Sequence, residues 1–173
     1  NIGTQAYVNC YKEILEFEKK EDIIFDYIFH ASGTGTTQAG LVCGSIINND
    51  KKNIVGISIA RKKPRGRDII VESVMDYLRS INRQYNYDSI TDKVIFTDKY
   101  IQSGYGSYNP EILDTIKTSL IKYGIPMDTT YVGKAFYGMN EYISEQKISN
   151  KNILFIHTGG TPLFFDDLEV LSE

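Results

Sequence analysis

The chain has 173 residues and a net charge of -3, from 19 basic and 22 acidic side chains. With 42% hydrophobic and 24% charged residues it has the composition of a globular protein with one ordinary core. The charge balance excludes a strongly basic surface, so neither nucleic acid nor a membrane is expected as a partner. The two cysteines, Cys10 and Cys43, form neither a metal-binding spacing nor a disulfide framework. We therefore expect a reduced, cytoplasmic protein without a metal site.

Apolar residues at helical spacing predict a helix over residues 4–20, and the apolar run 23–31 predicts a buried strand. The same patterns then predict a helix over 36–48, a strand over 53–60, a helix over 68–84, a strand over 94–96, a helix over 110–122, a helix over 133–144 and a strand over 152–157. Asn109 as the cap and Pro110 at the first helical position mark one helix start, and Gly124 marks the end of that helix. A short closing helix is expected after the turn at 158–162.

Strands that alternate with helices are joined by right-handed crossovers and form parallel sheets. The sequence therefore predicts an α/β fold over residues 1–173, a three-layer, doubly wound, mainly parallel sheet with helices on both faces. In such sheets ligands bind beyond the carboxyl ends of the strands. The loops to inspect follow Ala31, Ala60, Asp98 and His157.

The loop after the first strand has the sequence SGTGTTQAG, from Ser32 to Gly40. Its first two glycines permit positive φ and let a ligand approach the backbone, while three threonines add hydroxyl donors. The helix that follows offers free N–H groups and the positive end of its dipole. Together these groups suit a phosphate without Lys or Arg, although a strand–helix turn without a ligand is the alternative. The candidate phosphate-binding residues are Gly33, Thr34, Gly35, Thr36 and Thr37.

Three motifs in order, SGTGTTQAG, YVGKA and LFIHTGG, resemble D-cysteine desulfhydrase and 1-aminocyclopropane-1-carboxylate (ACC) deaminase. These are fold-type-II, tryptophan-synthase-β-like enzymes that use pyridoxal 5'-phosphate (PLP). The likeness runs from about Gly3 to Phe164. It implies that the chain is the C-terminal, PLP-phosphate-binding portion of the large domain, and that the N-terminal half with the Schiff-base lysine is absent. The chain alone is then expected to hold PLP non-covalently at most and to be inactive, whereas the full-length enzyme is expected to be a homodimer.

The resemblance also implies roles for individual residues. The loop from Gly33 to Thr37 would bind the cofactor phosphate, and Thr158 would face the pyridine nitrogen as a neutral hydroxyl partner. Tyr105 and Tyr131 match the two active-site tyrosines, whose phenols can hold or pass a proton beside a substrate amine. Lys134 belongs to the ordinary Gly-Lys motif and is not expected to form the Schiff base.

The residue after the second tyrosine separates the two activities in the resemblance, because deaminases carry Glu there and desulfhydrases carry Thr. This chain has Val132. The missing carboxylate makes the desulfhydrase, which converts D-cysteine to pyruvate, hydrogen sulfide and ammonia, the nearer match. The alternatives are an ACC deaminase, which gives 2-oxobutanoate and ammonia, and a non-catalytic module that binds a phosphate ligand. In either enzyme the partner is a small amino-acid substrate.

Other side chains are expected to be structural. His30 and His157 are predicted to be hydrogen-bonded structural histidines, and Cys43 a small core residue. The basic run from Arg61 to Arg67 is predicted to be a solvated loop, because no aromatic residues interleave it; the alternative is that it attracts an anionic substrate or tail. The same run occupies the place of the acidic ribose-binding residue of NAD sites, which disfavours that class of ligand.

Overall fold

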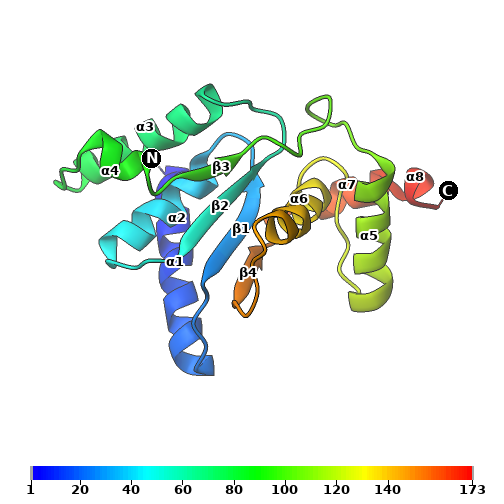
Figure 1. The fold of residues 1–173 in the computed structure, drawn as a ribbon, viewed down its shortest axis with the longest axis horizontal. Coiled ribbons are helices and arrows are strands. Elements are labelled where there is room, and N and C mark those ends of the chain that lie inside the picture. Colours follow the sequence, from blue (N-terminus) through cyan, green and yellow to red (C-terminus); the bar gives the residue numbers. More distant parts are fainter. Residues whose placement is uncertain (1, 173) are drawn as a thin grey trace.

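The structure is a computed structural model that describes residues 2–172, so Asn1 and Glu173, the two ends of the predicted domain, lie outside the described residues. Helices and strands alternate along most of the chain (Figure 1). In chain order they are α1 (Ile2–Glu21), β1 (Tyr27–Ser32), α2 (Thr36–Ile47), β2 (Asn53–Ser58), α3 (Arg65–Ser80), α4 (Tyr87–Thr91), β3 (Ile95–Thr97), α5 (Pro110–Tyr123), α6 (Val132–Glu145), β4 (Ile153–Ile156), α7 (Thr161–Asp166) and α8 (Leu168–Ser172).

The four strands form one parallel sheet in the order β3-β2-β1-β4. Phe29 of β1 lies opposite Val55 of β2 on one side and opposite Phe155 of β4 on the other. The chain runs outward from β1 to β2 and β3, and then returns to the free side of β1 as β4. The strand order therefore reverses between β1 and β4, and this reversal is where α/β sheets characteristically bind ligands.

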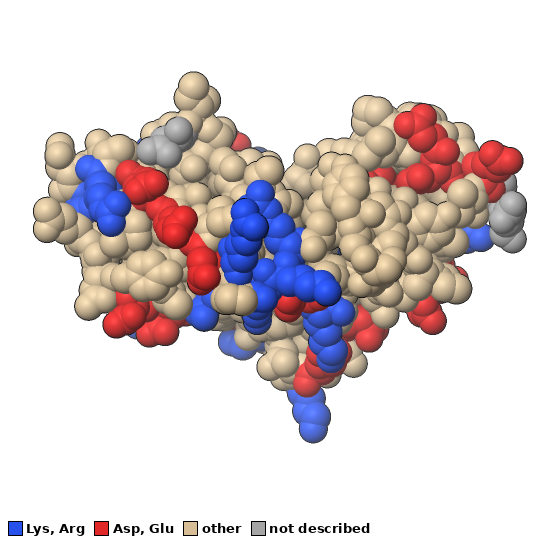
Figure 2. Space-filling model, turned by 90° about the horizontal axis from the view of Figure 1, so that it is seen from above, with Lys and Arg blue, Asp and Glu red and all other residues tan. Residues whose placement is uncertain are grey.

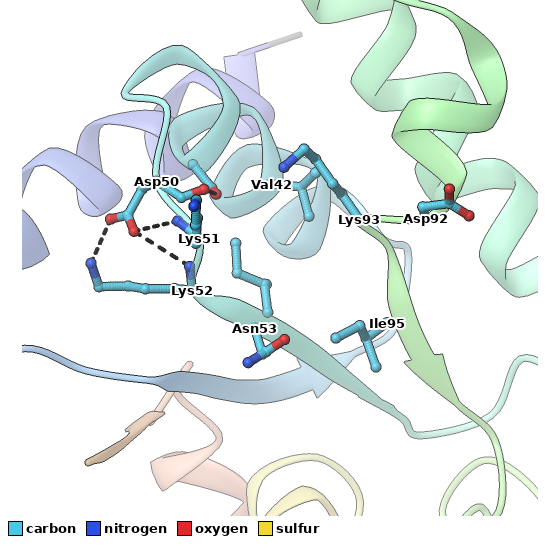
Figure 3. A pocket seen from close by; sticks show the side chains of 10 residues that line it. Val42, Asp50, Lys51, Lys52, Asn53, Asp92, Lys93 and Ile95 are labelled. Carbon is cyan, nitrogen blue, oxygen red and sulfur yellow. Dashed lines mark hydrogen bonds and ion pairs between the residues drawn. The ribbon is translucent and has the colours of Figure 1, made fainter. Parts of the chain in front are cut away.

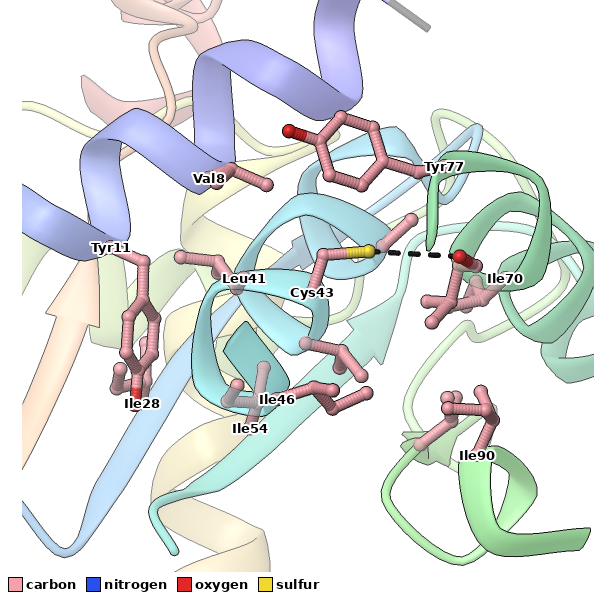
Figure 4. Close-up of a cluster of buried hydrophobic side chains, with 14 of the residues drawn as sticks. Val8, Tyr11, Ile28, Leu41, Cys43, Ile46, Ile54, Ile70, Tyr77 and Ile90 are labelled. Atoms are coloured by element: carbon pink, nitrogen blue, oxygen red, sulfur yellow. Dashed lines mark hydrogen bonds between the residues drawn. The ribbon is translucent and has the colours of Figure 1, made fainter. Parts of the chain in front are cut away.

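Helices cover both faces of the sheet, with α1, α2 and α3 on one face and α6 on the other, and α5 packs against α6 (Figure 1). Successive strand residues point to opposite faces, so Ile28 packs beneath α1 and α2 whereas Phe29 packs beneath α6. The larger core lies under the first three helices (Figure 4) and includes Val8, Tyr11, Ile28, Leu41, Cys43, Ile54 and Ile70. These layers confirm the three-layer, doubly wound α/β fold predicted from the sequence.

Two glycines let α1 lie unusually close to α2. A Cβ atom added at Gly40 would collide with Tyr7 of α1, and one added at Gly44 would collide with Tyr11. The glycines are four residues apart and therefore share one face of α2. The close packing brings Tyr7 to the end of the sheet at which β1 terminates.

Several boundaries differ from the predicted ones. β1 begins at Tyr27 rather than at residue 23; the residue before it, Asp26, accepts hydrogen bonds on its carboxylate from the backbone N–H of Asn152, at 2.9 Å, and from Nζ of Lys151, at 2.8 Å. α3 occupies residues 65–80 rather than 68–84, and the short helix α4 was not predicted. α5 matches its local signals: the side chain of Asn109 accepts from the N–H of Ile112, and Gly124 ends the helix in the left-handed conformation.

Some large apolar side chains are left on the surface. The most exposed lie at the start of α1, after α1, in the loop before α5, at the end of α5 and on α7, namely Ile2, Ile24, Tyr105, Ile121, Tyr123 and Phe165. Within residues 2–172, no helix combines the length and the apolar character needed to cross a membrane.

Candidate functional site

A cavity of about 400 Å³ opens at the carboxyl ends of β1 and β2, beside the reversal of strand order. Its volume lies in the range of small-molecule sites, roughly 300–1,000 Å³. Its walls come from α1, from the loops after β1, β2 and β4, and from the segments before α5 and α6. The lining residues are Tyr7, Ala31, Gly33, Thr34, Thr37, Ile59, Ala60, Arg61, Tyr105, Tyr131 and Thr158.

The structure brings six of the eight predicted site residues into this cavity wall: Gly33, Thr34, Thr37, Tyr105, Tyr131 and Thr158. Gly35 and Thr36 lie just behind it. The methyl group of Thr36 faces α1, where it comes within 2.6 Å of a Cβ added at Gly3, so this side chain supports the loop from behind.

The loop after β1 presents free donors to the cavity. Gly35 caps α2 with φ 96° and no side-chain hydrogen bond, so the N–H groups of the first helical turn have no side-chain acceptor. A Cβ added at Gly35 would approach Cγ1 of Ile70 to 2.8 Å, so glycine is required both by conformation and by space. The hydroxyls of Thr34 and Thr36 hydrogen-bond each other at 3.2 Å, which holds the turn. This donor set matches the acceptor oxygens of a phosphate.

The two predicted tyrosines meet in the wall opposite the loop. Their hydroxyls hydrogen-bond each other, and their rings stack edge to face with centroids 5.7 Å apart. Tyr105 stands in an exposed loop, whereas Tyr131 precedes the first residue of α6. The hydrogen bond with Tyr105, and after it burial, raises the pKa of Tyr131 above its ordinary value. This rise fits a Tyr131 hydroxyl that donates to Tyr105, which leaves the proton of Tyr105 to be directed into the cavity.

Asp128 fixes the position of Tyr131 and was not identified from the sequence. Its buried carboxylate accepts three backbone N–H groups at the start of α6, from Thr130 at 3.0 Å, Tyr131 at 2.7 Å and Val132 at 2.9 Å. The same carboxylate lies against Gly160, where an added Cβ would collide with Oδ1. Asp128 thus joins the helix that carries Tyr131 to the turn that carries Thr158. An acidic residue just before a helix start was the available signal.

Arg61 is the charged member among the described lining residues, and the sequence analysis missed it. Its Nη1 donates to the carbonyl of Thr34 at 3.3 Å, so the guanidinium lies beside the candidate phosphate-binding loop, residues 33–37. Lys62, Lys63 and Arg65 are exposed, as expected of a solvated loop, and the partly exposed Arg61 also lines the cavity because the end of β2 lies directly beside the end of β1. Seen from above, Lys and Arg side chains gather in the middle of the face (Figure 2), which favours an anionic ligand.

Two residues of the YVGKA motif do not enter the cavity. Val132 is fully buried and packs with Ile112, Ile116 and Met127. Lys134 is also fully buried, and burial lowers the pKa of its ammonium below the ordinary value. The cavity therefore receives neither a side chain from position 132 nor an amine from position 134.

A second cavity, of about 190 Å³, lies at the opposite end of the sheet (Figure 3). Its buried cation, Lys52, is paired with Glu18 at 2.9 Å and with Asp50 at 2.5 Å, and Tyr11 donates to Asp50 at 2.8 Å. Burial alone would raise the pKa of Asp50, but hydrogen bonds from Lys52 and Tyr11 outweigh it and hold the pKa below the ordinary value. These charges are paired within the protein. The cluster around Lys52 therefore links α1 to the end of the sheet, and we do not expect it to bind a ligand.

The histidines and Cys43 lie away from the first cavity. Nε2 of the exposed His157 lies 2.9 Å from the carbonyl of Pro126, and His30 is buried in β1. Cys43 is buried in α2 with Sγ 3.8 Å from the carbonyl of Val74 (Figure 4), and burial raises the pKa of its thiol to about 12. Within residues 2–172, no group of three or more His, Cys, Asp or Glu side chains is placed to hold a metal ion.

Comparison with known proteins gives a consistent set of relatives, although no protein-family model matches the chain. The chain is 31% identical to a candidate ACC deaminase of Pyrococcus abyssi, over 99% of this chain and 50% of that protein. It is 29% identical to D-cysteine desulfhydrase of Serratia proteamaculans and 31% identical to that of Yersinia pestis (strain Pestoides F), in each case over 95% of this chain and 48% of the relative. The chain thus spans about half the length of the curated relatives it matches.

Solved structures agree with the sequence comparison. The crystal structure of an ACC deaminase homologue superposes with a TM-score of 0.85 and 29% identity, covering 99% of this chain and 50% of that one. A mutant of O-ureido-L-serine synthase matches with a TM-score of 0.53 and 14% identity, a likeness of fold alone. The resemblance to D-cysteine desulfhydrase and ACC deaminase predicted from the three motifs is confirmed, and the match fits a fold-type-II domain.

Proposed function

We propose that this chain is the C-terminal, PLP-phosphate-binding portion of the large domain of a PLP-dependent lyase that acts on a small amino acid. One observation carries the proposal. The sequence motifs that the resemblance assigned to phosphate, ring nitrogen and substrate lie far apart in the chain, yet Thr37, Thr158 and Tyr131 line a single cavity. Its position at the reversal of strand order is the one that α/β sheets favour for ligands.

The residues present fit the cofactor. A phosphate would accept hydrogen bonds from the uncapped N–H groups of α2 and from the hydroxyls of Thr34 and Thr37, with the positive end of the helix dipole behind them. Arg61 adds one positive charge beside the same loop. Thr158 supplies a neutral hydroxyl for the ring nitrogen. When bound, PLP supplies the electron sink for bond cleavage at the substrate's α-carbon.

The protein's own part in the chemistry is to position the ligand and hold protons. Tyr105 and Tyr131 keep two phenolic hydroxyls side by side at the cavity wall, where one could donate to a substrate amine or leaving group. No lysine stands among the described residues that line the cavity. We therefore propose that the chain alone binds PLP non-covalently and does not turn over D-cysteine. Hydrogen sulfide release by the 173-residue chain with PLP would contradict this.

For the enzyme of which this segment forms about half, we propose D-cysteine as the substrate, with pyruvate, hydrogen sulfide and ammonia as products. ACC is the second candidate, because identities of 29–31% do not separate the two groups of relatives. Val132 sends its side chain into the core, so position 132 brings neither a carboxylate nor a hydroxyl to the substrate. Measuring pyruvate from D-cysteine against 2-oxobutanoate from ACC in that enzyme decides between them. We propose that it works as a homodimer, which its mass in solution tests.

Calorimetry with pyridoxine 5'-phosphate tests the cofactor site in this chain. This analogue has an alcohol in place of the aldehyde, so it cannot react with lysines. We expect it to bind the chain, whereas pyridoxine without the phosphate should bind at least tenfold more weakly, a difference of about 1.4 kcal/mol or more. Equal binding of the two compounds, or no binding of either, would refute the cofactor site and leave the non-catalytic alternatives.

Two glycine variants form a matched pair for the same assay. Gly35→Ala and Gly124→Ala both place a side chain at positive φ, 96° and 68°, which should cost each variant about 1–2 kcal/mol of stability; Gly35→Ala should lose more, because its added Cβ also meets Ile70. Gly124 ends α5, and no described atom lies within 4 Å of a Cβ added there. We expect only Gly35→Ala to weaken pyridoxine 5'-phosphate binding, because only that loop faces the ligand.

A further inference from the structure

Lys134 holds together two separate segments of the chain. Its Nζ donates to the carbonyl of Gly104 at 2.9 Å and to the carbonyls of Ile59 and Ile101, each at 3.3 Å. A lysine ammonium has three N–H donors, so these three bonds use all of them. Ile59 belongs to the loop after β2, whereas the other two carbonyls belong to the loop after β3.

A cation at this position is costly for the fold. Lys134 is fully buried, and removing a charged amine from water carries a large desolvation penalty. Asp128, a buried carboxylate nearby, favours the charge only as a secondary effect, because burial is the larger influence on the pKa of Lys134 and lowers it. An apolar residue would fill the same space without this penalty. The benefit of the ammonium therefore lies in the carbonyls that it binds.

The bound carbonyls stand directly before the residues that form two walls of the first cavity. Ile59 is followed by Ala60 and Arg61, which line the cavity beside the candidate phosphate-binding loop. Gly104 is followed by Tyr105, the exposed member of the tyrosine pair. The ammonium thus sets the distance between the wall that carries Arg61 and the wall that carries Tyr105.

The loop of Tyr105 makes few other backbone contacts outside itself. Gly104 and Gly106 both have positive φ, and a Cβ added at either would meet no described atom within 4 Å. The hydroxyl of Ser107 donates to the carbonyl of Gly104 at 2.8 Å, but that bond closes the loop on itself. Lys134 is the donor that ties the backbone of this loop to α6 and to the end of β2, beside the side-chain bond between Tyr105 and Tyr131 and the bonds of Lys99 and Tyr100 to Glu145 of α6.

We propose that Lys134 is a positioning residue: its buried ammonium ties the loops after β2 and β3 together, and this tie holds Arg61 and Tyr105 in place across the ligand cavity. The inference deepens the proposed function, since it assigns the group that shapes the same site. The geometric part concerns only the protein, so it can be tested without any ligand.

The test is Lys134→Met, which keeps an unbranched side chain one atom shorter and removes the three donors. Lys93→Met is the matched control, because Lys93 is exposed and lies beside the second cavity at the other end of the sheet. We expect Lys134→Met to remain folded, while amide hydrogen exchange accelerates at least tenfold in residues 59–61 and 101–106 but not in β1. The resonance of fluorotyrosine at position 105 should also shift toward that of a free surface tyrosine, because the contact with Tyr131 loosens.

The binding arm uses pyridoxine 5'-phosphate. If the ordered arrangement of the loops falls to about a tenth of the population, the apparent affinity falls about tenfold. Failure of wild-type protein to bind would count against the proposed function alone, because the exchange result does not involve ligand.

Unchanged exchange and an unchanged tyrosine resonance in folded Lys134→Met would overturn the positioning role. If Lys134→Met does not fold, Lys134→Gln, whose amide still donates to a carbonyl, takes its place and should show the same loosening to a smaller degree. If neither variant folds, Lys134 is required for the fold as a whole and the proposal is wrong.

Discussion

His30 makes the stability of the chain depend on pH in a predictable way. The imidazole is fully buried in β1, and its Nδ1–H donates to the carbonyl of Ala31 at 3.0 Å. Its Nε2 has no hydrogen-bond partner within the part of the chain that the structure describes. Protonation would place both a positive charge and an unpaired N–H in the core. Burial therefore lowers the pKa of His30 from 6.5 to about 4, although the bond to Ala31 opposes the change.

The magnitude follows from the two pKa values. Above pH 6.5 the histidine is neutral in both folded and unfolded chains, and between pH 6.5 and about 4 only the unfolded chain takes up the proton. The free energy of unfolding therefore rises with pH across this window. At about 1.4 kcal/mol per pH unit, lowering the pH through the whole window costs about 3 kcal/mol, of which about 2 kcal/mol is lost by pH 5. Asp26 and Asp50 have pKa values below their ordinary 3.8, so their losses come at lower pH.

Urea unfolding followed by circular dichroism at pH 5 and pH 7, at constant ionic strength, measures this difference. We expect wild type to be about 2 kcal/mol less stable at pH 5, and His30→Gln to lose most of that dependence whatever its absolute stability. His157→Gln, which removes the chain's other histidine from the surface, is the matched control and should keep the wild-type dependence. Equal wild-type stability at the two pH values, or an unchanged dependence in His30→Gln, would refute the reasoning.

Three further predictions concern the two cavities. Lys52→Met should cost about 3–5 kcal/mol in urea unfolding, because it leaves two carboxylates largely buried without their cation, whereas Lys51→Met should change little; a small effect of Lys52→Met would contradict the ion-pair account. Arg61→Gln should weaken pyridoxine 5'-phosphate binding about fivefold in calorimetry and reduce its dependence on salt, and Arg61→Lys should restore part of the affinity. Tyr105→Phe should lower the pKa of Tyr131 toward its ordinary value, because the hydrogen bond between the two phenols is the main cause of the rise. Carbon-13 NMR of labelled tyrosine measures the pKa of Tyr131, and an unchanged pKa would count against the pairing.

Local signals predicted the elements and the loops, whereas contacts between distant segments had to be seen in the structure. Asn109 begins α5 as its side-chain cap, and Gly124 ends the helix with positive φ. Both signals depend only on residues that are neighbours in the sequence. The carboxylate of Asp26, just before β1, bonds to the segment before β4, more than a hundred residues away in the chain. No periodicity carries that information.

The candidate site divides in the same way. The loop from Gly33 to Thr37 was visible as a sequence motif, and the resemblance named Thr158 and the two tyrosines. Arg61 and Lys134 were given no role in the site, because their places depend on which strand ends lie side by side. The sequence does not show that the end of β2, which carries Arg61, lies next to the end of β1. Nor does it show that three backbone carbonyls surround the ammonium of Lys134.

We propose that the loop after β1, residues 33–37, binds the phosphate of the cofactor. Amide NMR of the chain during titration with pyridoxine 5'-phosphate tests it directly, because each backbone N–H reports its own environment. We predict that the largest shifts fall on the amides of residues 33–37, with a second group near Thr158, and that inorganic phosphate reproduces only the first group. Shifts centred on the second cavity around Asp50 and Lys52, or no shifts at millimolar ligand, would contradict the account.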